Sequence, residues 1–167
     1  MNIRLALPAD AAAIARVHVE SWRTSYRGIV PDEVLDGLSV ERRIQQWEEA
    51  ISQPAWRHTL ILVAENQAGK IVGFASSGAE REGDPVYRGE LYAIYLLENA
   101  QRQGVGRALV AASARHLMES GLNTMLVWVF RENPARRFYE RLGGKYIREK
   151  LLTIGGVDLV EAAYGWR

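Results

Sequence analysis

The sequence lacks cysteine, long apolar runs and an excess of either charge. Without cysteine among its 167 residues, it cannot build disulfides, thiolate metal sites or a cysteine nucleophile, and we expect a cytoplasmic protein. Its 21 Lys and Arg face 20 Asp and Glu, a formal net charge of +1, so no whole-molecule field attracts nucleic acid or an anionic membrane. No apolar run approaches the roughly 18 residues of a membrane helix. We therefore expect neither a nucleic-acid partner nor a membrane partner.

Two kinds of catalytic site are also missing from the sequence. The three histidines, His18, His58 and His116, do not have metal-ligand spacing, so we predict no bound metal. There is no G-x-S-x-G segment, and a serine hydrolase would therefore lack its nucleophile turn.

Length and composition predict one domain over residues 1–167. At roughly 150 residues per domain the chain has room for a single core. Its 48% hydrophobic and 25% charged residues are the balance of an ordinary globular protein.

The N-terminal part predicts one strand followed by two helices. Apolar alternation predicts a strand over residues 3–7, and Asp10 is a plausible cap for the helix that follows and ends near Gly28. Three aromatic residues recur at every fourth position of that helix and so share one stripe: His18, Trp22 and Tyr26. Ser39 is expected to cap the second helix, which is amphipathic.

The rest of the sequence predicts six strands and two helices. The strands are expected over residues 59–65, 71–77, 87–97, 124–130, 145–154 and 157–164. One helix follows Gly106 and stops at Gly121, and Asn133-Pro134 opens another that Gly143 closes. The later half of 87–97 is apolar on both faces, which is typical of a central strand. This order predicts an α/β domain with a mixed sheet and helices on both faces.

The segment that carries chemistry is Gln101-Arg102-Gln103-Gly104-Val105-Gly106-Arg107, between a buried strand and a helix. Two glycines let the backbone approach a ligand, and the free N–H groups of a helix start favour an anion such as a diphosphate. The same glycine pair would also be explained, without any ligand, by a simple turn or by close packing of the helix. A P-loop is excluded, because Ala64 stands where Gly69-Lys70 would need the first glycine. A dinucleotide G-x-G-x-x-G motif is only half present, with Leu109 at its third position.

This segment resembles the diphosphate loop Q/R-x-x-G-x-G/A of the GNAT superfamily of acyl-CoA-dependent N-acyltransferases. Gln101, Gly104 and Gly106 match the loop. A second block of the family is matched by Asn133, Ala135, Phe138-Tyr139-Glu140 and Gly143. The family loop often follows a proline and carries an extra glycine, where this chain has Glu98 and Arg102.

The resemblance implies a mostly antiparallel sheet with one splayed parallel strand pair, and acetyl-CoA as the acyl donor. It implies that the loop from Gln101 to Arg107 binds the diphosphate. Backbone groups of Ile94, Tyr95 and Leu96 would hold the pantetheine arm and polarise the thioester carbonyl. Asn133 would contact the cofactor in addition to capping its helix.

The resemblance also implies catalytic roles for two residues. Tyr139 would protonate the leaving thiolate, although spacing alone describes it as part of an apolar helix stripe. Glu90, or a water relay near Tyr92, would take the proton of the acceptor amine, although a solvated glutamate at a strand end is an equal interpretation. Trp22 and Tyr26 would wall the acceptor pocket, although an aromatic stripe is also typical of a core.

These residues predict an N-acetyltransferase that moves the acetyl group of acetyl-CoA directly to a primary amine of a small molecule or peptide. Two alternatives remain at this point: a non-catalytic acyl-CoA-binding module and a nucleotide-binding protein. Retention of Tyr139 and Glu90 favours the enzyme, because a pure binder needs neither. The hairpin around Gly155-Gly156 offers a sheet edge through which a homodimer could form.

Overall fold

The computed structural model describes residues 1–53 and 59–167; His58 lies outside them. A single mixed sheet of seven strands has the order β1-β2-β3-β4-β5-β7-β6. All neighbouring strands are antiparallel except β4 (Gly89–Leu96) and β5 (Met125–Phe130), which are parallel. The other strands are β1 (Asn2–Leu5), β2 (Leu60–Glu65), β3 (Ile71–Ala79), β6 (Lys145–Ile154) and β7 (Val157–Trp166). The segment with an apolar later half is therefore the central strand, as predicted.

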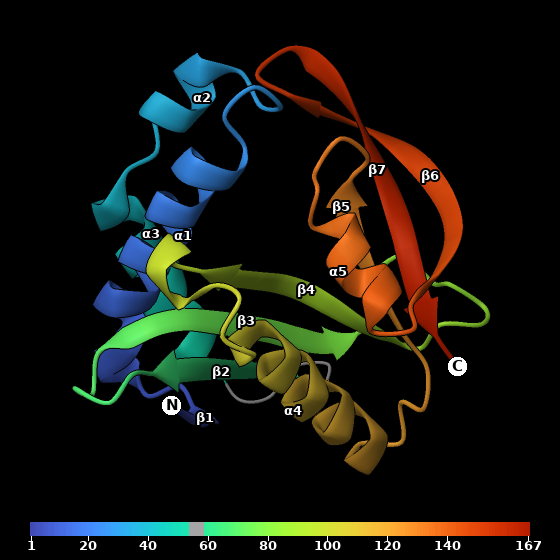
Figure 1. Cartoon of the computed structure of the whole chain (residues 1–167), viewed down its shortest axis with the longest axis horizontal. Helices are drawn as coiled ribbons and strands as arrows, with labels where there is room; N and C mark the ends of the chain where they lie inside the picture. The colour runs from blue at the N-terminus through green and yellow to red at the C-terminus, as the bar shows by residue number, and fades with distance from the viewer. Residues whose placement is uncertain (54–58) are drawn as a thin grey trace.

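Helices cover both faces of the sheet, which confirms the predicted fold class. On one face lie α1 (Ala11–Ser25), the short α2 (Asp32–Asp36) and α3 (Val40–Ser52); on the other lie α4 (Val105–Glu119) and α5 (Arg136–Arg141) (Figure 1). Two further turns are 3-10 helices, Pro8–Asp10 and Glu98–Ala100. Among the described residues, no helix is long and apolar enough to cross a bilayer.

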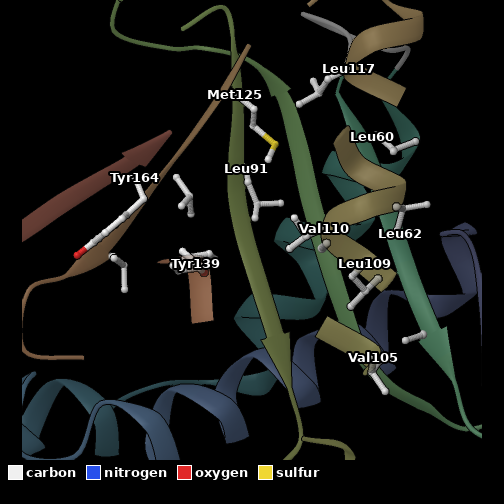
Figure 2. Close-up of a cluster of buried hydrophobic side chains, with 14 of the residues drawn as sticks. Leu60, Leu62, Leu91, Val105, Leu109, Val110, Leu117, Met125, Tyr139 and Tyr164 are labelled. Carbon is white, nitrogen blue, oxygen red and sulfur yellow. The ribbon is translucent and has the colours of Figure 1, made fainter. Parts of the chain in front are cut away.

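Apolar side chains on both sides of the central strands form two cores. Along β2, Leu60 and Leu62 face α4, while Ile61 and Val63 face α1. On the α4 side, the helix buries its stripe against β2, β3, β4 and β5, as Figure 2 shows. A strand buried on both faces reads as a continuous apolar run, which is why β2 and β4 were recognisable in the sequence.

One predicted helix cap is right in position only, and another is wrong. Asp10 stands at the N-cap of α1 as predicted, but its carboxylate accepts hydrogen bonds from Arg4 and from the amide of Leu7, at 2.7 Å, and makes no capping bond to the helix. The last helix begins at Arg136 rather than at Asn133-Pro134. The side chain of Asn133 instead accepts from the amide of Ala135 at 2.9 Å and closes an Asx turn ahead of the helix. The Ser39 cap is confirmed, since its hydroxyl accepts from the amide of Arg42 at 3.2 Å.

The β6–β7 hairpin arches over the sheet toward α2 (Figure 1). Its turn consists of Gly155 and Gly156, both with positive φ, as predicted. A Cβ atom on Gly155 would lie 2.5 Å from the side chain of Val34 in α2. Glycine therefore allows the tip to contact α2 and to enclose the space between the hairpin and α1.

Candidate active site

The parallel strands β4 and β5 separate soon after they meet. They pair only at Gly89 with Met125, Glu90 with Leu126 and Leu91 with Val127. Immediately afterwards the register between β3 and β4 shifts and skips Tyr92, which marks a β-bulge. A bulge bends its strand, so β4 turns away from β5. The result is a cleft of about 650 Å³ that passes between the two strands from one face of the sheet to the other.

The loop before α4 presents a row of free amides at one mouth of this cleft. Arg102 has φ 60° and Gly104 has φ 81°, left-handed conformations that turn successive N–H groups toward one side. In the part of the chain that the structure describes, none of the amides of residues 102–107 donates a hydrogen bond to the protein; Ala108 is the next residue that does so. The helix start therefore offers these donors to an anion.

Side chains of the same loop hold its shape. The amide group of Gln101 donates to the carbonyl of Leu96 at 3.2 Å, and that of Gln103 donates to the carbonyl of Asn99 at 2.8 Å. Gly106 lies against the ring of Phe138, which a Cβ atom there would approach to 3.2 Å. The second glycine of the loop is thus required by close packing as well as by any ligand.

Three tyrosines line the middle of the cleft. The hydroxyls of Tyr26 and Tyr95 lie 3.1 Å apart and hydrogen-bond to each other. Tyr139 of α5 is 6% exposed, and its ring packs on Phe138 and Trp166. Burial, with a smaller contribution from Tyr95, raises the pKa of Tyr139 well above 10. Its hydroxyl donates to no other described residue and stays protonated at neutral pH, so it is available as a proton donor.

Aromatic rings also line the mouth on the α1 side. Tyr92 and Trp128 both line the cleft there. Arg81 lies over the ring of Tyr92 at 4.5 Å, and Lys150 lies over that of Trp128 at 4.0 Å. The indole N–H of Trp128 is buried and has no hydrogen-bond partner among the described residues. This mouth therefore combines flat apolar walls with charged groups at its rim.

Comparison with known proteins identifies the family to which this fold belongs. Residues 19–144 match the model of the acetyltransferase (GNAT) family. The chain belongs to the GNAT family of acetyltransferases. An uncharacterized N-acetyltransferase, YuaI of Bacillus subtilis, is 40% identical over 99% of this chain and 92% of its own length.

Two solved structures share the GNAT fold of this chain. YncA of Salmonella typhimurium, a putative acetyltransferase solved with acetyl-CoA, has a TM-score of 0.74 at 22% identity over 100% of this chain and 93% of that one. The PaiA N-acetyltransferase of Thermoplasma acidophilum, solved with coenzyme A, has a TM-score of 0.70 at 20% identity over 96% of each chain.

Most of the predicted site residues of this GNAT domain line the cleft. They are Tyr26, Ile94, Tyr95, Leu96, Gln101, Arg102, Gly104, Gly106, Arg107, Asn133 and Tyr139. Sequence reasoning missed Trp128 as a cleft residue, because strand periodicity assigns it to the core. Phe138 was matched only as part of the second family block, and the structure places it in the wall of the cleft.

Four predicted residues do not line the cleft: Trp22, Glu90, Gln103 and Val105. Trp22 lies behind Tyr26, with the two rings edge to face at 5.0 Å. Glu90 is 2% exposed and accepts hydrogen bonds at both carboxylate oxygens from Arg81. Gln103 and Val105 contribute backbone amides to the loop. The structure thus places Tyr139, the predicted proton donor, in the cleft wall. Glu90, the predicted base, lies outside the lining and is paired with Arg81.

The described residues hold no group of three or more His, Asp or Glu side chains that could bind a metal ion. The backbone amides of the loop, rather than metal ligands, are the groups that the cleft offers to a diphosphate.

Proposed function

We propose that this acetyltransferase moves the acetyl group of acetyl-CoA directly to a primary amine of a small molecule or peptide. The observation that carries the proposal is the row of unengaged amides at residues 102–107, placed at one mouth of a cleft that crosses the sheet. The coenzyme A and acetyl-CoA held by the two solved neighbours support the same donor.

The cleft divides naturally between the two substrates. The diphosphate binds the loop amides, with Arg102 and Arg107 adding positive charge. The pantetheine arm enters between the strands and hydrogen-bonds to the backbone of residues 94–96, where β4 no longer pairs with β5. Asn133, whose side-chain oxygen is occupied by Ala135, has its amide N–H groups left for the cofactor. The amine enters from the opposite mouth, beside Tyr92 and Trp128.

Transfer requires a neutral amine and a protonated leaving group. The nitrogen lone pair attacks the thioester carbonyl carbon, a C–N bond forms and the C–S bond breaks. Backbone N–H groups of β4 stabilise the negative charge on the carbonyl oxygen. Tyr139 donates its hydroxyl proton to the departing sulfur, and the proton that the acylated nitrogen loses returns to the Tyr139 oxygen. Burial raises the pKa of Tyr139, so its hydroxyl is protonated before the transfer.

Turnover of acetyl-CoA with a set of amines tests the proposal. Thiol release is followed in the presence of alkylamines, diamines, amino acids and short peptides, and the acetylated product is identified by mass spectrometry. We expect amine-dependent thiol release with acetylation on nitrogen. Stabilisation of the fold by acetyl-CoA without turnover of any amine would instead assign the chain as a binding module.

We also propose that the protein forms a homodimer through β6. This strand is one edge of the sheet, and several of its apolar side chains are exposed, among them Tyr146 and Leu151. An exposed edge offers unpaired backbone groups to a second copy, and pairing would cover these side chains.

A further inference from the structure

The rim of the cleft on the α1 side carries cations that are each matched to a carboxylate. Arg81 contacts the ring of Tyr92, and Arg148 and Lys150 contact the ring of Trp128. The ion pairs are Arg81 with Glu90, Arg148 with Asp84 and Lys150 with Glu82. An acceptor carboxylate would therefore find no unmatched cation among these three.

One more carboxylate, Glu161 of β7, lies beside this rim, just outside the residues that line the cleft itself. The sheet register places it between Phe130 of β5 and Lys150 of β6. Leu159, two residues earlier in β7, packs with Tyr26 and Phe130 on the α1 side, whereas Ala162 belongs to the core on the α4 side. Because side chains alternate along a strand, Glu161 points to the α1 side with Leu159. Its side chain is partly buried and makes no hydrogen bond or ion pair with any residue that the structure describes.

Glu161 lies near two of the tyrosines that line the cleft. Burial raises the pKa of both Tyr26 and Tyr95, and the nearby Glu161 contributes to the increase in each. The charged groups around Glu161 are Lys150 of β6, Arg81 and Glu82 of the β3–β4 loop, and Glu90 of β4. Glu161 is thus the carboxylate that the matched pairs leave without a direct cation.

We propose that Glu161, rather than Glu90, attracts the acceptor as an ammonium ion and takes its proton through one bridging water. This inference rests on the proposed function. The ammonium N–H bond breaks, its electron pair stays on nitrogen as the attacking lone pair, and the proton forms an O–H bond on the Glu161 carboxylate. The cleft consequently selects cationic amines and rejects amines that carry a carboxylate.

The environment of Glu161 suits this transfer. Burial is the main cause that raises its pKa, with Lys150 opposing the change. A higher pKa narrows the gap to an alkylammonium of about 10.4 and makes the proton transfer less costly. Glu90 is not free to accept a proton in the same way, because Arg81 already donates hydrogen bonds to both of its carboxylate oxygens.

Selectivity is tested with three amines of equal length: 1,5-diaminopentane, pentylamine and 5-aminopentanoate. We expect kcat/KM to be highest for the diamine and at least about tenfold lower for the amino acid than for pentylamine, because two like charges repel at the rim. Equal or better turnover of 5-aminopentanoate overturns the selectivity. If the wild-type protein acetylates none of these amines and none in the wider set, the proposed function fails, and this inference fails with it.

The role of Glu161 is tested separately with Glu161→Gln and the best amine. We expect kcat/KM for the amine to fall by about 100-fold, as for loss of a general base, with KM for acetyl-CoA unchanged. The fall in kcat/KM at acidic pH that we expect of the wild type should disappear. Glu149→Gln is the matched control, since Glu149 is exposed and its register partner, Ala162, belongs to the α4-side core; it should retain wild-type kinetics.

Two outcomes would overturn the assignment while leaving the proposed function intact. One is a Glu161→Gln variant with wild-type kcat/KM and an unchanged pH profile. The other is a Glu90→Gln variant that loses the acid limb of the profile while Glu161→Gln keeps it. Should Glu161→Gln fail to fold, Glu161→Asp takes its place: we expect it to keep the acid limb with kcat reduced by about tenfold, and an unreduced kcat or a lost limb contradicts the proposal.

Discussion

At the scale of single residues, Tyr139 carries the clearest catalytic prediction. Tyr139→Phe keeps the buried ring and its packing but removes the hydroxyl at the cleft wall. We expect kcat to fall by about tenfold or more, with little change in the dissociation constant of acetyl-CoA. Steady-state kinetics and titration calorimetry measure the two quantities. An unchanged kcat would remove Tyr139 from the mechanism, and a large loss of affinity would assign it to binding instead.

His18 makes stability depend on pH. Burial, with a smaller contribution from the charge of Arg43, lowers the pKa of His18 to about 3. Its Nδ1 accepts the indole N–H of Trp47 at 3.2 Å, and its ring stacks on Tyr95. In the unfolded chain the histidine has an ordinary pKa near 6.5, so below that pH it binds a proton that the folded protein does not bind. Stability is therefore complete above pH 6.5 and falls as the pH drops below it.

The pH effect of His18 is measurable by urea unfolding. Between pH 7 and pH 5 we expect the free energy of unfolding to fall by about 2 kcal/mol from this residue alone. His18→Gln, whose carbonyl still offers Trp47 an acceptor, should show a correspondingly smaller pH dependence. His116→Gln in α4 serves as the control and should behave as the wild type does. Identical pH dependence in His18→Gln and the wild type would mean that His18 is not buried and neutral.

At the scale of elements, we expect the junction of residues 101–107 and α4 to control cofactor affinity. In Gly106→Val the new side chain would meet the ring of Phe138 and the side chain of Leu96. We expect the dissociation constant of acetyl-CoA to rise by about tenfold or more, because displacement of the loop misaligns several amide donors at once. Ala108→Val is the matched control, since Ala108 is exposed on the next part of the same helix. Equal affinity in both variants would contradict the loop assignment.

The elements themselves were largely predictable, and their ends were not. Strand and helix periodicity identified all seven strands and the four longer or motif-bearing helices. The start of α5 was predicted wrongly because the Asn133 side chain closes a turn ahead of the helix, and Asp10, although it stands at the N-cap of α1, bonds to Arg4 instead of to the helix. A short polar side chain has several backbone and side-chain partners within reach, and only the folded geometry selects one.

At the scale of the whole molecule, the exposed β6 edge predicts the oligomeric state. Sedimentation equilibrium should give twice the 18.8 kDa mass of one chain. Leu151 is 69% exposed on β6, and we expect Leu151→Glu to shift the protein to a monomer by placing a charge in the paired edge. Met118→Glu places the same charge on an exposed position of α4 and should leave the dimer intact. A monomeric wild type would exclude this interface.

The sequence by itself determined the order of strands and helices, the glycine-containing loop before α4 and the place of Tyr139 in its helix, because each depends on local periodicity or on a short motif. Only the tertiary structure decided which glutamate beside the cleft is left without a cation. Glu90 matched the expected base position, yet Arg81 from a neighbouring loop neutralises it. Glu161 lies in a strand whose sequence pattern does not distinguish it from any other polar strand residue. Ion pairing and burial join residues that are distant along the chain, so no local pattern could distinguish these two glutamates.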